Sequence, residues 1–150
     1  MAEKTTQTLR EESLLTSRAI SSHMVNEFAS LEGGVLSPLE GRVFGFICRN
    51  QDKNVTSTDL MAHFDSPKST ISETLSSLEE RGYILFEVNP EDRRQKYLRL
   101  TEKGLARFEG VLVLFSQAEE KMTEGLSEED IATYLRVCEQ IRRNLGTKNG

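Results

Sequence analysis

The chain has 150 residues, of which 37% are hydrophobic and 29% charged, and its formal net charge at pH 7 is −5. This length and composition are typical of one folded, helix-rich domain with a real core, and they exclude a disordered chain. The sequence has no apolar run near 18 residues and no signal-peptide pattern at its N-terminus, so we expect a cytoplasmic protein without a membrane partner.

Charge is unevenly distributed along the chain. Residues 66–104 hold seven Lys/Arg and seven Asp/Glu, whereas the remainder holds twelve basic and seventeen acidic residues. The net negative charge argues against indiscriminate nucleic-acid binding. A directed DNA-binding surface in the middle of the chain is still compatible with this distribution.

A long first helix is predicted over residues 9–31. Its apolar residues recur at helical spacing on one face, namely Ile20, Met24, Phe28 and Leu31. The Gly33-Gly34 pair ends it. A second helix begins at Ser37-Pro38-Leu39-Glu40, where serine is the cap, proline takes the first helical position and glutamate completes a capping box.

A short third helix follows the cap Thr56-Ser57-Thr58-Asp59, and the stretch Asp65-Ser66-Pro67 is predicted to end it and cap a fourth. The fourth helix, residues 67–81, buries Ile71, Leu75 and Leu78. Its opposite face is polar and consists of Lys68, Ser69, Thr70, Ser72, Glu73, Ser76 and Ser77.

A hairpin is predicted next, with strands over residues 83–88 and 96–100 and a turn around Pro90. Thr101 is a plausible cap for the helix that follows. The turn and return strand carry four cations within seven residues and no acid among them: Arg93, Arg94, Lys96 and Arg99. A cationic hairpin tip can grip phosphates or enter a narrow groove. Two long apolar-faced helices complete the chain.

The order of the predicted elements indicates a mainly α (α+β) winged helix-turn-helix fold. That order is a helix, a short helix, a tight turn, a polar-faced helix and a hairpin. The fourth helix would then lay its polar face in a major groove, where serine, threonine and lysine bond base edges or phosphates. The alternative interpretation is that this polar face contacts only solvent.

Three motifs carry a family resemblance: residues 75–84 (LSSLEERGYI), Asp92-Arg93-Arg94, and Leu100-Thr101-Glu102-Lys103-Gly104. They resemble the MarR family of bacterial transcriptional regulators over about residues 37–105. The flanking helices match that family only in placement and length. Two residues depart from the pattern, because many relatives carry an arginine where this chain has Glu73 and a basic residue where it has Phe86.

The resemblance implies a homodimer that binds double-stranded DNA at a pseudo-palindromic operator, usually as a repressor released by a small ligand or an oxidant. It implies one MarR-like domain over residues 1–150, with residues 37–104 as the DNA-binding part. Residues 9–31 and 105–146 would be dimerisation helices.

Site residues follow from the same resemblance. Arg94 would enter the minor groove and Asp92 would hold its side chain in place, while Arg93 and Lys96 would contact phosphates. The recognition helix and its cap would contribute Ser66, Lys68, Ser69, Thr70, Ser72 and Glu73. Because Glu73 repels phosphate while accepting a bond from cytosine N4, we expect weaker non-specific binding than is typical of the family.

An effector pocket is a further expectation from the family. His23, Phe28, Phe44 and Cys48 could line it, or could simply fill the core. Neither cysteine lies near the start of the first helix, where oxidant-sensing relatives carry theirs. The pair His23 and Glu27 has zinc-binding spacing but lacks further ligands, so no metal or cofactor is predicted.

No enzyme motif is present: the sequence has no phosphate-binding glycine loop, GxSxG or HExxH. The alternative to a DNA-binding regulator is a winged-helix adaptor or antagonist that acts through protein contacts and binds little DNA. Glu73 and the negative net charge favour the adaptor, whereas the intact motif Asp92-Arg93-Arg94 favours DNA binding. A regulator that responds to oxidants or zinc is a lesser alternative.

Overall fold

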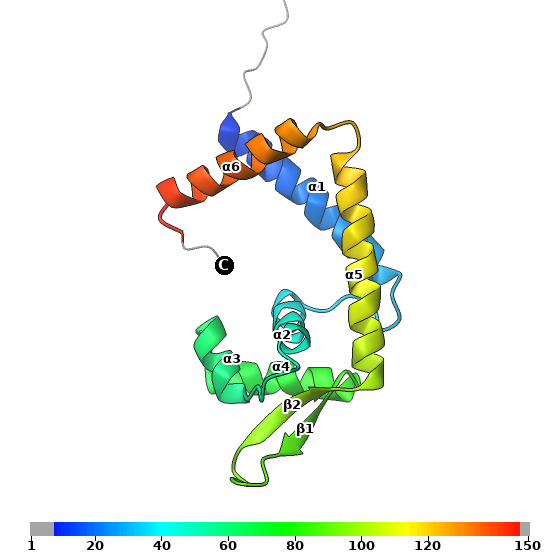
Figure 1. Cartoon of the computed structure of the whole chain (residues 1–150), viewed down its shortest axis with the longest axis vertical. Helices are drawn as coiled ribbons and strands as arrows, with labels where there is room; N and C mark the ends of the chain where they lie inside the picture. The colour runs from blue at the N-terminus through cyan, green and yellow to red at the C-terminus, as the bar shows by residue number, and fades with distance from the viewer. Residues whose placement is uncertain (1–7, 148–150) are drawn as a thin grey trace, which may run out of the picture. The chain divides into compact units, whose positions relative to one another are not determined.

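The computed structural model of the chain describes residues 8–147 (Figure 1). Within that range it contains six α-helices and one two-stranded sheet, which confirms the predicted mainly α winged-helix fold. The elements are α1 Leu9–Ala29, α2 Pro38–Arg49, α3 Ser57–Phe64, α4 Lys68–Glu80, β1 Ile84–Val88, β2 Lys96–Leu100, α5 Glu102–Thr123 and α6 Glu128–Asn144. The chain forms two compact units that divide within α5, between Leu114 and Phe115.

Local sequence signals set most helix starts. Capping boxes form at Thr8, Ser37, Thr56 and Ser127, where each side chain accepts a bond from the backbone N–H three residues on. The starts predicted for α2 and α3 are thereby confirmed.

The stretch Asp65-Ser66-Pro67 ends α3 and begins α4 as predicted, but no side chain caps α4. Pro67 is the N-cap of α4 and makes no side-chain bond. Asp65 instead ends α3 in the left-handed conformation, with φ of 46°, and the Ser66 hydroxyl donates to the Phe64 carbonyl at 3.1 Å. The turn between the two helices is so short that both polar residues are used to finish α3.

The core lies among α2, α3, α4 and the hairpin. The predicted buried face of α4 is confirmed, since Ile71, Leu75 and Leu78 are at most 2% exposed. Phe44 and Cys48 of α2 belong to the same core. This packing leaves the opposite face of α4 turned away from the core.

The strands pair antiparallel, with Ile84 opposite Leu100 and Phe86 opposite Leu98. The Leu98 N–H donates to the Val55 carbonyl at 2.8 Å, which ties β2 to the segment before α3. In Figure 1 the hairpin projects past α4, so its tip stands clear of the helices of its own unit.

The junction between β2 and α5 is confirmed as a threonine cap. The Thr101 hydroxyl oxygen accepts from the Gly104 N–H at 2.9 Å and donates to the Gly82 carbonyl at 2.5 Å. The cap therefore fixes the start of α5 against the end of α4.

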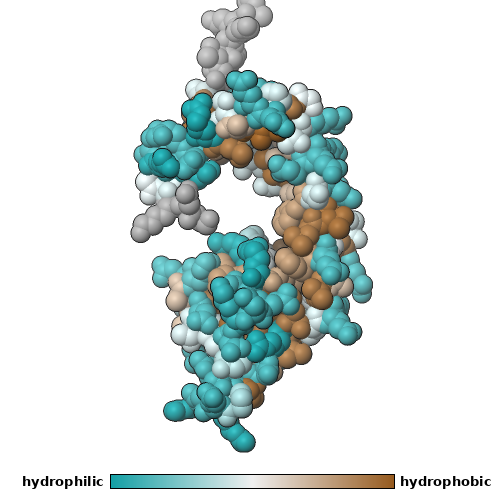
Figure 2. All heavy atoms as spheres, in the orientation of Figure 1, coloured by the Kyte–Doolittle hydropathy of each residue, from teal (hydrophilic) through white to brown (hydrophobic). Residues whose placement is uncertain are grey.

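Large apolar side chains remain exposed on the terminal helices. On α5, Leu112 and Val113 are about half exposed, and on α6 Tyr134 and Leu135 are more than half exposed. Figure 2 shows hydrophobic residues gathered along the middle of α5. Along residues 8–147, no helix is long and apolar enough to cross a membrane.

Candidate nucleic-acid interface

The predicted polar face of α4 is solvent-facing. Lys68, Ser69, Ser72 and Glu73 are exposed; Thr70 is half-buried, and its backbone carbonyl accepts from the Thr74 hydroxyl at 2.8 Å. Side chains on such a face can reach base edges or phosphates when a helix lies in a major groove.

Ser77 does not belong to that face. It is half-buried, and its hydroxyl donates to Oε1 of Glu40 on α2, an oxygen that also lies 3.6 Å from the Arg81 Nε. The second carboxylate oxygen of Glu40 accepts from the Ser37 N–H at 2.7 Å. Glu40 thus caps α2 and anchors the C-terminal half of α4, and this second role was missed.

Burial of Glu40 raises the pKa of its carboxyl group, but the bonds from Ser77 and Ser37, together with the Arg81 charge, lower the pKa by more, so the net shift is downward. A depressed folded-state pKa adds stability above the unfolded value of 4.5, and that stability is lost as the pH falls through the folded value. The anchor of α4 therefore weakens in acid.

We predict that Glu40→Gln lowers the free energy of unfolding by about 1 kcal/mol or more at pH 7, because the bond from Ser77 loses its charged acceptor. The deficit should shrink as the pH falls below 4.5, because the unfolded chain then takes up a proton before the folded carboxylate does. Urea unfolding at pH 7 and pH 3.5 measures both values, and Glu79→Gln, an exposed change on α4, serves as the control. An equal deficit at the two pH values would contradict this role of the charge.

The tip of the hairpin presents one arginine held by one acid. The Asp92 Oδ1 accepts from the Arg94 N–H at 3.1 Å and lies 3.6 Å from the Arg94 Nε, while the Arg94 side chain is 95% exposed. Asn89 secures the base of the tip, because its N–H donates to the Gln95 carbonyl at 3.0 Å and its amide donates to the Gln95 side chain. The geometry suits the predicted roles of Asp92 and Arg94, and contact with DNA stays a prediction.

Two further cations flank Arg94. Arg93 is exposed, and Lys96 is exposed with its Nζ 5.8 Å from the centroid of the Phe86 ring. The Phe86 ring therefore supports a neighbouring cation. Together Arg93, Arg94 and Lys96 give the hairpin a compact positive tip.

Arg99, the fourth cation of the cluster, has a structural role. Its Nε lies 2.5 Å from the Glu87 Oε2, its Nη2 donates to the Asn54 side chain at 2.8 Å, and its Nη1 donates to the Lys53 carbonyl at 3.4 Å. It therefore ties the hairpin to the loop between α2 and α3. The diagonal spacing of Glu87 and Arg99 across the predicted hairpin is the one sequence signal for this bond.

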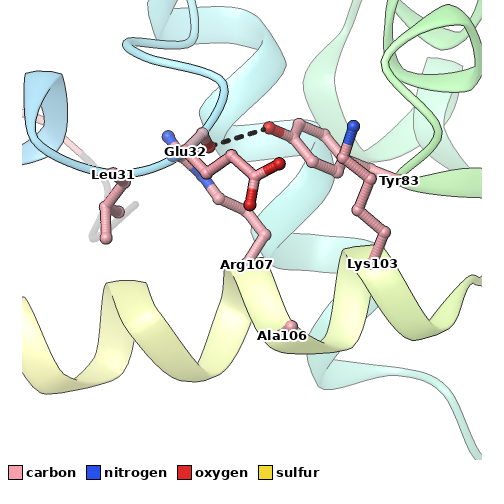
Figure 3. A pocket seen from close by; sticks show the side chains of 6 residues that line it. All are labelled: Leu31, Glu32, Tyr83, Lys103, Ala106 and Arg107. Carbon is pink, nitrogen blue, oxygen red and sulfur yellow. Dashed lines mark hydrogen bonds between the residues drawn. The ribbon is translucent and has the colours of Figure 1, made fainter.

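The four residues predicted to line an effector pocket are spread over the fold. His23 and Phe28 are half-buried on α1, whereas Phe44 and Cys48 fill the core. The cavity beside α5 (Figure 3) is lined by other residues: Leu31, Glu32, Tyr83, Lys103, Ala106 and Arg107. Sequence spacing missed this cavity because its walls come from three separate segments.

Two observations bear on the redox and zinc alternatives. Burial raises the pKa of the Cys48 thiol to about 12, which keeps it protonated at neutral pH and disfavours the reactive thiolate. In the described part of the chain, no group of three or more His, Cys, Asp or Glu side chains is placed to hold a metal ion.

Comparisons with known proteins agree with the geometry. A model of the MarR family matches residues 36–95, which run from the residue before the Ser37 cap to the tip of the hairpin. The HTH-type transcriptional regulator BilQ of Clostridioides difficile is 29% identical over 105 residues, covering 68% of this chain and 71% of BilQ. The HTH-type transcriptional repressor IacR of Pseudomonas putida is 26% identical over 106 residues, covering 71% of this chain and 62% of IacR.

Solved structures share the fold. The crystal structure of the S. aureus MepR-DNA complex matches with a TM-score of 0.71 and 20% identity, covering 92% of this chain and 98% of that one. The curated relatives are regulators rather than enzymes, as the sequence led us to expect. The motifs, the winged helix and these matches together support the MarR family of DNA-binding transcriptional regulators for this chain.

Proposed function

We propose that this regulator acts in the cytoplasm as a homodimeric repressor that binds a pseudo-palindromic operator. In each subunit α4 enters a major groove and the hairpin tip enters the adjacent minor groove. The observation that carries this proposal is the fully exposed Arg94 side chain held beside Asp92 at the tip of a braced hairpin. The DNA-contacting residues would be Ser66, Lys68, Ser69, Thr70, Ser72, Glu73, Arg93, Arg94 and Lys96.

The terminal helices would form the dimer. Residues 9–31 and 105–146 carry exposed apolar side chains that a lone winged module over residues 37–104 does not need. A two-fold dimer would place two copies of α4 about one helical turn of DNA apart. A stable monomer in sedimentation at micromolar concentration would contradict this part of the proposal.

A gel shift with DNA from the promoter region of the protein's own gene tests operator binding directly. A discrete shifted band that competes with specific but not with unrelated DNA is expected. The adaptor alternative draws on exposed Glu73 and the net charge of −5, and it predicts no shift with any fragment from that neighbourhood.

The affinity of this protein for its operator should depend only modestly on salt concentration. Each subunit offers only Lys68, Arg93, Arg94 and Lys96 as cations on the proposed interface, so a dimer makes at most about eight phosphate contacts. Counterion release then gives a slope of log K against log salt of about −5 to −7. A titration by fluorescence anisotropy measures it, and a slope of −9 or steeper would show that other cations take part.

Release of the operator by a small molecule is part of the proposal. The cavity beside α5 supports it, because it lies within the unit that contains α4 and the hairpin.

A further inference from the structure

One acidic side chain lies at the centre of the outward face of α4. The opposite side of this helix is formed by its buried residues, Ile71, Thr74, Leu75 and Leu78. With 3.6 residues per turn, the positions directly opposite that side are Ser69, Glu73 and Ser76, and all three are exposed. Between Lys68 and Glu79, Glu73 is the only charged residue. The middle of this face is therefore one carboxylate with a serine about one turn away on either side.

The Glu73 carboxylate is unpaired in the described structure. Its neighbours on the helix, three and four positions away, are Ser69, Thr70, Ser76 and Ser77. None of them is a cation, and the Ser77 hydroxyl donates to Glu40 on α2 instead. Within residues 8–147, Glu73 forms no salt bridge and its side chain makes no hydrogen bond. Its carboxylate oxygens can therefore accept from a donor outside the chain.

A carboxylate is selective among the base edges of a major groove, because it can only accept hydrogen bonds. Guanine presents the acceptors N7 and O6 there, and thymine presents the acceptor O4 and a methyl group. Adenine presents its N6 donor beside the N7 acceptor, which repels a negative oxygen. Cytosine presents the N4 amino donor alone. A carboxylate therefore favours cytosine over the other three bases.

We propose that Glu73 is the specificity-determining residue of α4 and reads one cytosine in each half-site of the operator. Its carboxylate accepts from the N4 amino group of that cytosine. The hydroxyls of Ser69 and Ser76 both donate and accept, so they impose no comparable choice of base. This inference rests on the function proposed above, because it needs α4 in a major groove, and it adds the identity of one base pair.

The same charge penalises every other base at that position. A carboxylate that leaves water without meeting a donor loses its hydration and is repelled by the phosphates nearby. Replacing the cytosine by A, G or T should therefore weaken binding about tenfold in each half-site, as is typical of a mismatched base pair. If Glu73 only repelled phosphates, removing it would instead strengthen binding to all sequences alike. The direction of the change separates the two roles.

Selection from a random double-stranded DNA library by the full wild-type chain should give a consensus with one cytosine at the same position of both half-sites. Fluorescence anisotropy at fixed salt then measures binding to duplexes that carry each of the four bases there. Glu73→Ala should bind the cytosine duplex more weakly than the wild type does, and the other three more tightly. Glu73→Gln should prefer adenine, because an amide bonds both N6 and N7.

Glu79→Gln is the matched control, since it removes the same charge from an exposed position of α4 off the centre of this face. It should keep the cytosine preference. Alanine and glutamine are good helix formers, so all three variants should fold, which circular dichroism checks. An unchanged preference in both Glu73 variants, or tighter binding of Glu73→Ala to all four duplexes, would overturn the inference and leave operator binding standing. If the wild type enriched no sequence, the proposed function would fail, and this inference with it.

Discussion

Arg94→Ala is expected to weaken operator binding by about 30-fold or more. Losing one arginine contact in a groove costs about 1–3 kcal/mol, and a two-fold dimer loses it twice. The structure leads to a large effect because the Arg94 side chain is 95% exposed at the hairpin tip, where Asp92 accepts from its backbone N–H, and nothing in its own unit keeps it from a groove. The effect should be strongest at operators with A·T-rich minor grooves, where the negative potential is concentrated.

Competition gel shifts at fixed salt measure this loss, and neighbouring variants separate the role of Arg94 from simple charge. Arg93→Ala and Lys68→Ala remove the same charge and should each cost less, with a nearly uniform loss across DNA sequences. Asp92→Asn keeps Arg94 but removes the negative charge beside its Nε, so its effect should lie in between. If Arg94→Ala and Lys68→Ala reduced the affinity for the operator by equally small factors, the hairpin would not be the main source of DNA affinity.

Features that depend on neighbouring residues could be predicted from the sequence. The capping boxes at Ser37, Thr56 and Ser127 join residues three apart, so their pattern is visible in the chain itself. The buried face of α4 follows in the same way from periodicity. Even here no side chain caps α4, because Asp65 and Ser66 are used to end α3.

Long-range side-chain bonds could not be predicted. Glu40 meets Ser77 across 37 residues, Arg99 meets Asn54 across 45, and Arg107 meets Glu32 across 75. Glu40 and Arg99 each had a local explanation that hid the second role: Glu40 as a cap and Arg99 as a cation of the hairpin. The cavity beside α5 was missed for the same reason, since its walls come together only in the folded chain.

Gly104→Ala is expected to destabilise the fold severely, by about 3 kcal/mol or more. Gly104 does not have a positive φ, so the need for glycine here is one of space. A Cβ at this position would lie 2.0 Å from the Tyr83 carbonyl oxygen and 3.0 Å from its carbon, both backbone atoms. Neither can move freely, because the Thr101 N–H donates to that same carbonyl at 3.1 Å. The glycine that ends the motif Leu100–Gly104 thus lets α5 start in contact with the end of α4.

Gly41→Ala provides the matched control, because it makes the same chemical change in open space. Gly41 lies within α2, and a Cβ there would meet nothing within 4 Å. Alanine should therefore stabilise the helix by up to about 1 kcal/mol. In thermal unfolding, Gly104→Ala should lower Tm by about 6–12 °C and Gly41→Ala should raise it by about 2–4 °C. Equal shifts would mean that α5 does not pack closely on Tyr83. The hairpin would then lack the support that holds it in position for the groove contact of Arg94.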